Sequence, residues 1–103
     1  MRVHVEGVLR DHPELRRYGI RGGESIILLM LDPNEGGLPI EIRWPAGNSP
    51  EDYLKAQAQC LRWKRFSLVQ AQGRALEFVA DHGQARIQLR HVERLTVASE
   101  VVR

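Results

Sequence analysis

Basic and aromatic side chains stand next to one another at two places in this sequence, and the combination has a definite chemistry. Residues 62–65 read Arg-Trp-Lys-Arg, and Arg43 directly precedes Trp44. A guanidinium offers a planar fork of donors that fits a phosphate, and an aromatic ring offers a face on which a nucleobase can stack. Because thirteen of the fifteen basic residues are arginine, the composition favours phosphate contacts of this kind.

The C-terminal third carries much of the positive charge. Residues 62–94 contain seven basic and three acidic side chains. Arg86 and Arg90 share one face of an alternating segment, about 13 Å apart at the usual rise of a strand, so this row can follow successive phosphates. With the arginine-rich segment around Tyr18, the predicted nucleic-acid contacts are Arg17, Tyr18, Arg43, Trp44, Trp63, Lys64, Arg65, Arg74, Arg86 and Arg90.

These residues also have a purely structural interpretation. The arginines can form a solvated face that pairs with nearby acids, namely Glu77, Asp81 and Glu93. Trp44 can cap the core, and Trp63 can tuck under a sheet at a helix-to-strand corner. The rings of Tyr53 and Phe66 are assigned to the core.

The residue types that support catalysis or metal binding are scattered. The four histidines, at positions 4, 12, 82 and 91, have no second histidine or cysteine at metal-ligand spacing. The glycine-containing segment 21–25 lacks the spacing and the lysine of a phosphate loop. Cys60 fits a small helix residue better than a reactive thiol. The sequence therefore predicts no catalytic residue, no metal and no cofactor.

Length and composition predict one globular domain that spans residues 1–98, with a frayed end at 99–103. The longest apolar run, Ile26 to Leu31, is far too short to cross a bilayer. The opening residues, MRVHVEG, lack the apolar region of a secretory signal. We therefore expect a cytoplasmic protein without a membrane contact, which the single cysteine also favours.

Apolar patterning predicts three strands in the first half of the chain. Residues 2–9 and 38–44 alternate between apolar and polar side chains, and residues 25–32 form a continuous apolar run. Residues 10–24 carry one proline and three glycines, and are predicted to form a loop.

The second half is predicted to begin with a helix. Ser49, Pro50 and two acids form a helix-start signal, and the helix should end near residue 60 or 61 with an apolar stripe of Tyr53, Leu54, Ala58 and Leu61. Residues 66–80 then form one or two strands, Asp81-His82-Gly83 forms a hinge, and residues 85–97 form the final strand. The predicted fold is therefore mainly β, a five-stranded OB-fold barrel with one short helix between strands three and four. Another small α+β barrel is the alternative.

Three segments resemble the bacterial single-stranded DNA-binding proteins. VHVEGVLRDHPELR (3–16) resembles their opening strand and turn, with His12 inserted before the proline. EDYLKAQAQCLRWKRFSLVQAQGRAL (51–76) resembles their helix and fourth strand, and HGQARIQLRHVERLTV (82–97) resembles their closing hairpin and last strand. The resemblance implies an OB-fold that binds single strands through phosphate neutralisation and base stacking.

In two respects the chain departs from typical members of that family. It has no acidic, apolar tip behind a long tail, and it has only six aromatic residues. It is similar in this to compact tailless relatives such as primosomal replication protein N, which implies a homodimer with replication proteins as partners. The apolar run 26–31 also fits a homodimer, because a strand that is apolar on both faces needs cover on each. Alternatively, the barrel interior and the helix cover both faces.

Two hypotheses follow from the sequence. The first is a non-enzymatic protein that binds single-stranded DNA, with RNA as the alternative ligand, in replication, recombination or the maintenance of plasmid or phage DNA. The second is an OB-fold protein-interaction or structural subunit of a larger assembly that binds no nucleic acid itself.

Overall fold

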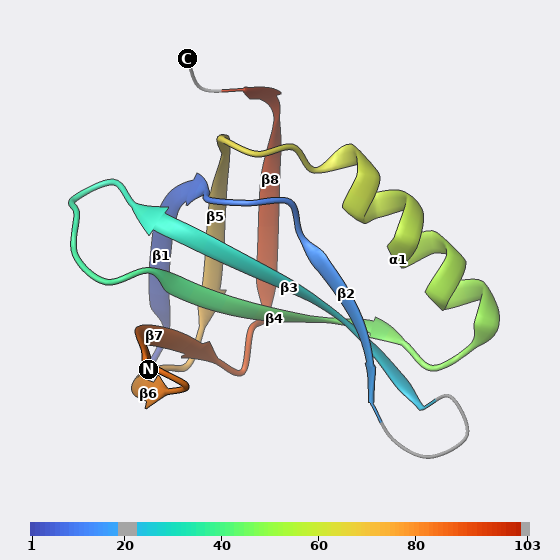
Figure 1. The fold of residues 1–103 in the computed structure, drawn as a ribbon, viewed down its shortest axis with the longest axis horizontal. Helices are drawn as coiled ribbons and strands as arrows, with labels where there is room; N and C mark the ends of the chain where they lie inside the picture. The colour runs from blue at the N-terminus through green and yellow to red at the C-terminus, as the bar shows by residue number, and fades with distance from the viewer. Residues whose placement is uncertain (19–22, 102–103) are drawn as a thin grey trace.

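Eight strands and one helix make up residues 1–18 and 23–101, the part of the chain that the computed structural model describes (Figure 1). In chain order they are β1 (Val3–Leu9), β2 (Glu14–Tyr18), β3 (Glu24–Pro33), β4 (Ile40–Gly47), α1 (Pro50–Arg62), β5 (Ser67–Gly73), β6 (Ala75–Asp81), β7 (Gln84–Arg90) and β8 (Arg94–Val101). The prediction of a mainly β fold with one helix is confirmed.

All eight strands belong to one sheet. Its hydrogen-bonded order is β6-β7-β4-β3-β1-β5-β8, and β2 also pairs with β3. β1 pairs with the end of β3 and β2 with its beginning, both antiparallel. The pairing of β4 with β7 is parallel, whereas β1 and β5 run antiparallel. The parallel pair joins the C-terminal hairpin, whose two arms are β5–β6 and β7–β8, to the first half of the chain.

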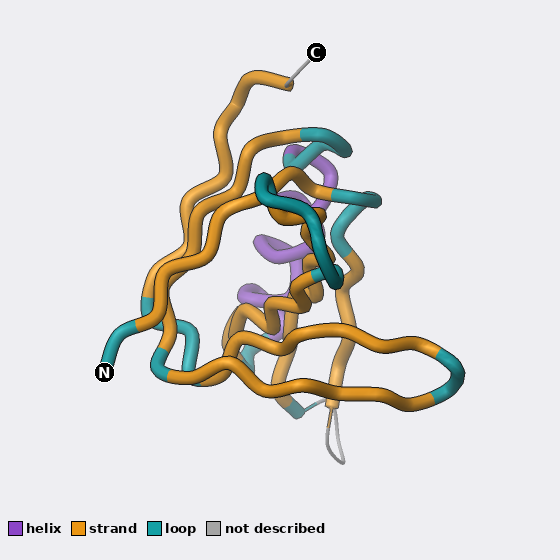
Figure 2. Tube along the Cα trace, turned by 90° about the vertical axis from the view of Figure 1, so that its left-hand side faces the viewer, coloured by secondary structure: helices purple, strands orange, loops and turns teal. Residues whose placement is uncertain are grey.

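The C-terminal hairpin is sharply bent. Arg74 alone separates β5 from β6, and residues 91–93 separate β7 from β8. β6 pairs with β7 while β5 pairs with β8, and the β6–β7 end projects from the body of the sheet (Figure 2). A Cβ atom on Gly73 would lie 2.6 Å from the Arg90 carbonyl oxygen and 2.8 Å from Leu89 Cδ1. The bend therefore brings β5 against β7 at a point where only glycine fits.

The number of strands differs from the predicted five. Residues 14–18 were expected in a loop, but their backbone pairs with β3 as β2 while Glu14 and Arg16 stay exposed. The remaining additional strands arise because both arms of the C-terminal hairpin break at the bend. β2 depends on pairing with the neighbouring β3, and the break at the bend depends on β5 pairing with β8 while β6 pairs with β7. Alternation within a single segment does not show these pairings.

The core lies on the inner face of the sheet. Its buried apolar residues come from five strands and the helix: Val5, Leu9, Ile27, Leu29, Leu31, Ile40, Ile42, Ala56, Val69, Ala71 and Leu89. Burying a Val, Leu or Ile side chain contributes about 1.5–3 kcal/mol each. α1 lies alongside β2, β3 and β4 (Figure 1).

β3 carries the continuous apolar run, and its two faces differ. The residues that face the core are buried: Ile27, Leu29 and Leu31. Those on the other face are half-buried: Ile26, Leu28 and Met30. Part of the second face is therefore covered within the chain, and the homodimer stays a prediction.

The helix begins where predicted. Ser49 Oγ accepts a hydrogen bond from the Asp52 backbone N–H (3.0 Å), and Asp52 Oδ2 accepts one from the Ser49 N–H (3.3 Å). This capping box satisfies two N–H groups at the helix start.

The predicted apolar stripe of the helix is wrong at three of its four positions, because Leu54, Ala58 and Leu61 are exposed. Leu54 and Leu61 are 63% and 80% exposed, while Ala56 is buried and Tyr53 and Cys60 are half-buried. The face with the small Ala56 side chain lets the helix approach the sheet closely, so tertiary contact decides which face is buried.

Candidate functional site

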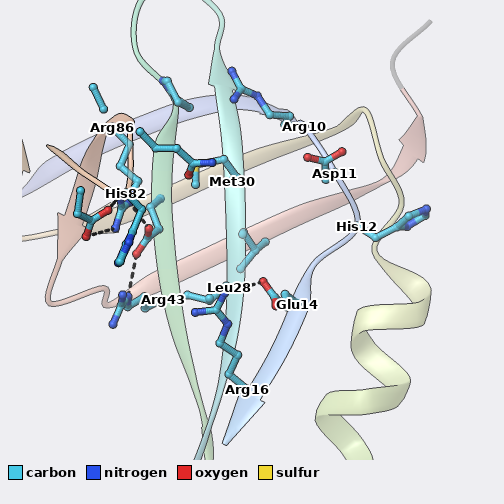
Figure 3. A pocket seen from close by; sticks show the side chains of 16 residues that line it. Arg10, Asp11, His12, Glu14, Arg16, Leu28, Met30, Arg43, His82 and Arg86 are labelled. Carbon is cyan, nitrogen blue, oxygen red and sulfur yellow. Dashed lines mark hydrogen bonds and ion pairs between the residues drawn. The ribbon is translucent and has the colours of Figure 1, made fainter. Parts of the chain in front are cut away.

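A groove of about 710 Å³ lies over the outer face of β3 and β4 (Figure 3). Its floor includes Leu28, Met30, Glu41 and Arg43. The link between β1 and β2, with the start of β2, forms one wall through Arg10, Asp11, His12, Glu14 and Arg16. The tip of the β6–β7 hairpin forms the other through Asp81, His82, Gln84, Ala85 and Arg86.

The groove is strongly charged but balanced. Its lining includes four arginines and four carboxylates: Arg10, Arg16, Arg43 and Arg86 against Asp11, Glu14, Glu41 and Asp81. His82 lies on the hairpin side of the groove and His12 on the opposite side (Figure 3). A ligand in the groove would therefore contact both guanidinium donors and carboxylate acceptors, and the charges of these lining side chains largely cancel.

Five side chains of this region form one hydrogen-bonded cluster, which we call the Glu41 cluster: Glu41, Arg43, Asp81, Arg86 and Gln88. Arg86 Nε donates to Glu41 Oε2, and its Nη1 donates to Asp81 Oδ1 at 2.6 Å. Arg43 Nε and Gln88 Nε2 both donate to Glu41 Oε1, at 2.8 and 2.9 Å. The side chains of Glu41 and Arg86 are only 8% and 11% exposed. The cluster thus fastens the hairpin tip to β4.

The cluster holds its carboxylates in the ionised form. Burial by itself raises the pKa of Glu41, but hydrogen bonds from Arg43, Gln88 and Arg86 outweigh it and the pKa lies below its ordinary value. The hydrogen bond from Arg86 likewise lowers the pKa of Asp81. Arg86 is therefore committed to two carboxylates, which makes it a positioning residue for the groove wall.

The other groove arginines are paired at the surface. Arg10 donates to Asp32 Oδ1 through Nε (2.9 Å) and Nη2 (2.7 Å), and Arg16 lies 3.0 Å from Glu14 Oε2. The side chains of both pairs are roughly half exposed. Exposed pairs of this kind are worth about 0–1 kcal/mol, so a phosphate can compete for these guanidinium groups.

A second hollow of about 230 Å³ shares Arg43 with the groove. Arg90 and His91 line it, and Arg90 Nη1 donates to Gln88 Oε1 at 2.9 Å. The predicted residues Arg43, Arg86 and Arg90 therefore do lie along one continuous face, with Arg43 at its centre.

The two tryptophans predicted as aromatic contacts do not line this face. Trp44 and Trp63 are half-buried and pack against the core, as the structural interpretation of the sequence had it. The Tyr18 side chain lies outside the described part of the structure. Phe66, which was assigned to the core, is 46% exposed, and this assignment is corrected.

The remaining predicted basic residues are dispersed. The Arg17 guanidinium carbon lies 4.8 Å from the centre of the Tyr53 ring, and Arg74 Nε lies 3.0 Å from Glu93 Oε1. Lys64 and Arg65 are exposed in the turn between α1 and β5. None of these residues lines the groove.

Arg10 and Arg16 line the groove, but the sequence did not single them out. Both belong to the segment 10–24 that was predicted to be a loop. The signal that could have identified Arg10 is its position at the end of one strand, with Asp32 near the end of another. If those strands pair, the two charges meet.

Residues 1–18 and 23–101 contain no cluster of three His, Cys, Asp or Glu side chains that could hold a metal ion. Burial raises the pKa of the Cys60 thiol, so it is protonated at neutral pH. None of the described helical structure is long and apolar enough to pass through a bilayer.

Comparison of the sequence with models of known protein families finds no match. Comparison with curated proteins finds no similar sequence either.

Proposed function

We propose that this protein binds single-stranded DNA, without catalysis, in the groove over β3 and β4. The proposal includes an OB-type barrel in which the eight strands are segments of five bent ones. In that reading β1 and β2 form the first strand, β5 and β6 the fourth, and β7 and β8 the fifth, with α1 between the third and the fourth. The parallel β4–β7 pair and the antiparallel β1–β5 pair support it.

The position of the groove is the observation that carries the proposal. OB folds bind oligonucleotides on the face of their second and third strands, between the loops that follow the first and the fourth. In this chain that face is β3 and β4, and the β6–β7 tip is the loop that follows the fourth strand. The link between β1 and β2 at Arg10, which is the bend within the first strand, flanks the other side of the groove. The groove therefore lies on this face beside one of the two loops and contains four arginines.

When a single strand binds, its phosphates would replace the carboxylates as partners of the groove arginines. The side chains of Arg10, Arg16 and Arg43 are 44–47% exposed at the groove, whereas that of Arg86 is only 11% exposed. Leu28 and Met30 offer apolar floor beneath the bases. Contacts of this kind read the backbone and the flat faces of bases, so we expect little sequence preference. RNA is the alternative ligand.

The cellular setting is proposed from the sequence resemblance alone. On that basis the protein is cytoplasmic and acts in replication, recombination or the maintenance of plasmid or phage DNA. It acts there as a homodimer with replication proteins as partners.

A fluorescence anisotropy titration tests the proposal. A labelled oligo-dT of about 30 nucleotides, long enough for any single-domain site, is titrated at low and moderate salt with duplex DNA as control. Each neutralised phosphate contributes about −0.7 to the slope of log K against log salt, so contacts from three arginines predict a slope of about −2.

Matched variants locate the site in the same assay. Arg43→Gln should weaken binding and make the slope shallower, whereas Arg94→Gln changes the net charge equally on β8, outside the groove lining. Equal effects of the two variants, or no binding of the wild type at micromolar protein and low salt, would contradict the proposal.

The charge balance of the groove favours a second candidate function, a protein-interaction or structural subunit without nucleic-acid binding. Every arginine of the groove lining forms an ion pair with a carboxylate, so net charge does not attract a polyanion to the groove itself. The same titration separates the two candidates, since this one predicts no salt-dependent binding of oligo-dT.

A further inference from the structure

Phe66 combines two features that are costly for a phenylalanine. The residue is 46% exposed, and its backbone φ is 71°, in the left-handed region where a bulky L residue is strained. The Phe66 N–H donates to the Leu9 carbonyl oxygen at 2.8 Å, which fixes the backbone in this turn. Glycine would adopt this conformation without a steric penalty. Strained residues that packing does not explain are candidates for a functional role.

Arg65 connects this ring to the groove. Its guanidinium carbon lies 4.6 Å from the centre of the Phe66 ring, a cation–π distance. Its Nε donates to the carbonyl oxygen of Arg10 at 2.9 Å, and Arg10 lines the groove wall. The ring and the guanidinium therefore form one unit at the β1–β2 side of the groove.

The basic side chains around Phe66 form no ion pair within residues 1–18 and 23–101. In the described part of the chain, no salt bridge involves Arg62, Lys64 or Arg65, and all three side chains are exposed. The arginines of the groove, in contrast, all have carboxylate partners. An exposed aromatic ring beside unpaired cations is the arrangement that holds one base and its adjacent phosphate.

We propose that Phe66 and Arg65 form a stacking platform for one nucleobase, with Lys64 at the neighbouring phosphate. The platform rests on the proposed function and extends its binding path from the groove, past Arg10, to the turn between α1 and β5. It assigns base stacking to Phe66 and leaves Trp44 and Trp63 to the core.

Phe66→Gly is the test, because it removes the ring and also relieves the backbone strain. Affinity for oligo-dT should fall at least about fivefold, the lower end for loss of one base–aromatic stack. The urea midpoint should stay the same or rise. Phe66→Tyr keeps a ring and should retain the wild-type affinity. Phe78→Ala removes another exposed ring, on β6 and outside the groove lining, and should leave the affinity unchanged.

The outcomes separate this inference from the proposed function. If the wild type binds and Phe66→Gly binds equally well, the platform is wrong while the groove proposal stands. A lowered urea midpoint for Phe66→Gly would mean that the ring serves packing, which also overturns the platform. Failure of the wild type to bind any oligonucleotide overturns both. Ultraviolet cross-linking of the wild-type complex should attach thymine to the peptide that contains Phe66, and an adduct only elsewhere would count against it.

Discussion

Replacing Arg86 by methionine removes the cation at the centre of the Glu41 cluster. Taking away one partner of a buried ion pair costs about 3–5 kcal/mol when the other charge is left alone. Glu41 keeps its hydrogen bonds from Arg43 (2.8 Å) and Gln88 (2.9 Å), so its charge is only partly uncompensated. We therefore expect Arg86→Met to lower the free energy of unfolding by about 2–3 kcal/mol.

Urea unfolding followed by tryptophan fluorescence measures this difference, because Trp44 and Trp63 both pack against the core. Arg90→Met on the same strand is the matched control. Arg90 Nε lies 3.6 Å from Glu77 Oε2 and both side chains are about half exposed, so its loss should cost less than about 1 kcal/mol. If Arg86→Met costs no more than Arg90→Met, the cluster does not fasten the hairpin and the reasoning fails.

The pH dependence gives an independent check on the same cluster. Because the folded-state pKa values of Glu41 and Asp81 lie below their unfolded-state values, the cluster contributes its full stability above those unfolded-state values. That stability is lost as the pH falls through the lower folded-state pKa values. The difference between wild type and Arg86→Met should thus narrow below about pH 4. A difference that stays constant with pH would contradict the ionic origin.

Two further substitutions test how the fold is built. Gly73→Ala places a Cβ against the Arg90 carbonyl oxygen and Leu89 at the hairpin bend, and should cost about 1–3 kcal/mol in thermal or urea unfolding; an unchanged stability would mean that the bend can relax. Ser49→Ala removes the acceptor for the Asp52 N–H, and loss of such an N-cap should lower the free energy of unfolding by about 1 kcal/mol. The helical circular dichroism signal should also be reduced near the unfolding transition. A neutral Ser49→Ala would show that tertiary packing alone fixes the helix start.

Local signals in the sequence predicted several elements correctly. The Ser49-Pro50 start of α1, the buried run of β3 and the hinge between β6 and β7 each depend on a few adjacent residues. β2 was not predicted, because residues 14–18 become a strand only by pairing with β3. The helix shows the same limit of local patterns. Packing against the sheet buries the face with Ala56 and leaves Leu54 and Leu61 exposed.

The candidate site was predictable in part for a similar reason. The alternation of residues 38–44 sets Glu41 apart from the apolar positions of its strand, and Arg86 was predicted on the polar face of its own strand. Alternation could not indicate that these faces meet through the parallel β4–β7 pair, which buries both side chains in one cluster. The basic neighbours of Trp44 and Trp63 likewise predicted these two residues as stacking contacts, while both pack against the core and the turn after α1 exposes Phe66.

Mapping of amide chemical shifts on addition of oligo-dT tests the central claim most directly. The account predicts that the amides of Leu28, Met30 and Arg43 on the groove floor, and of His82 at the hairpin tip, shift together along the titration. The exposed outer face of α1 around Leu54 should not respond. Shifts confined to α1 or to other surfaces, or the absence of any shift at low salt, would contradict a single-strand binding site in this groove.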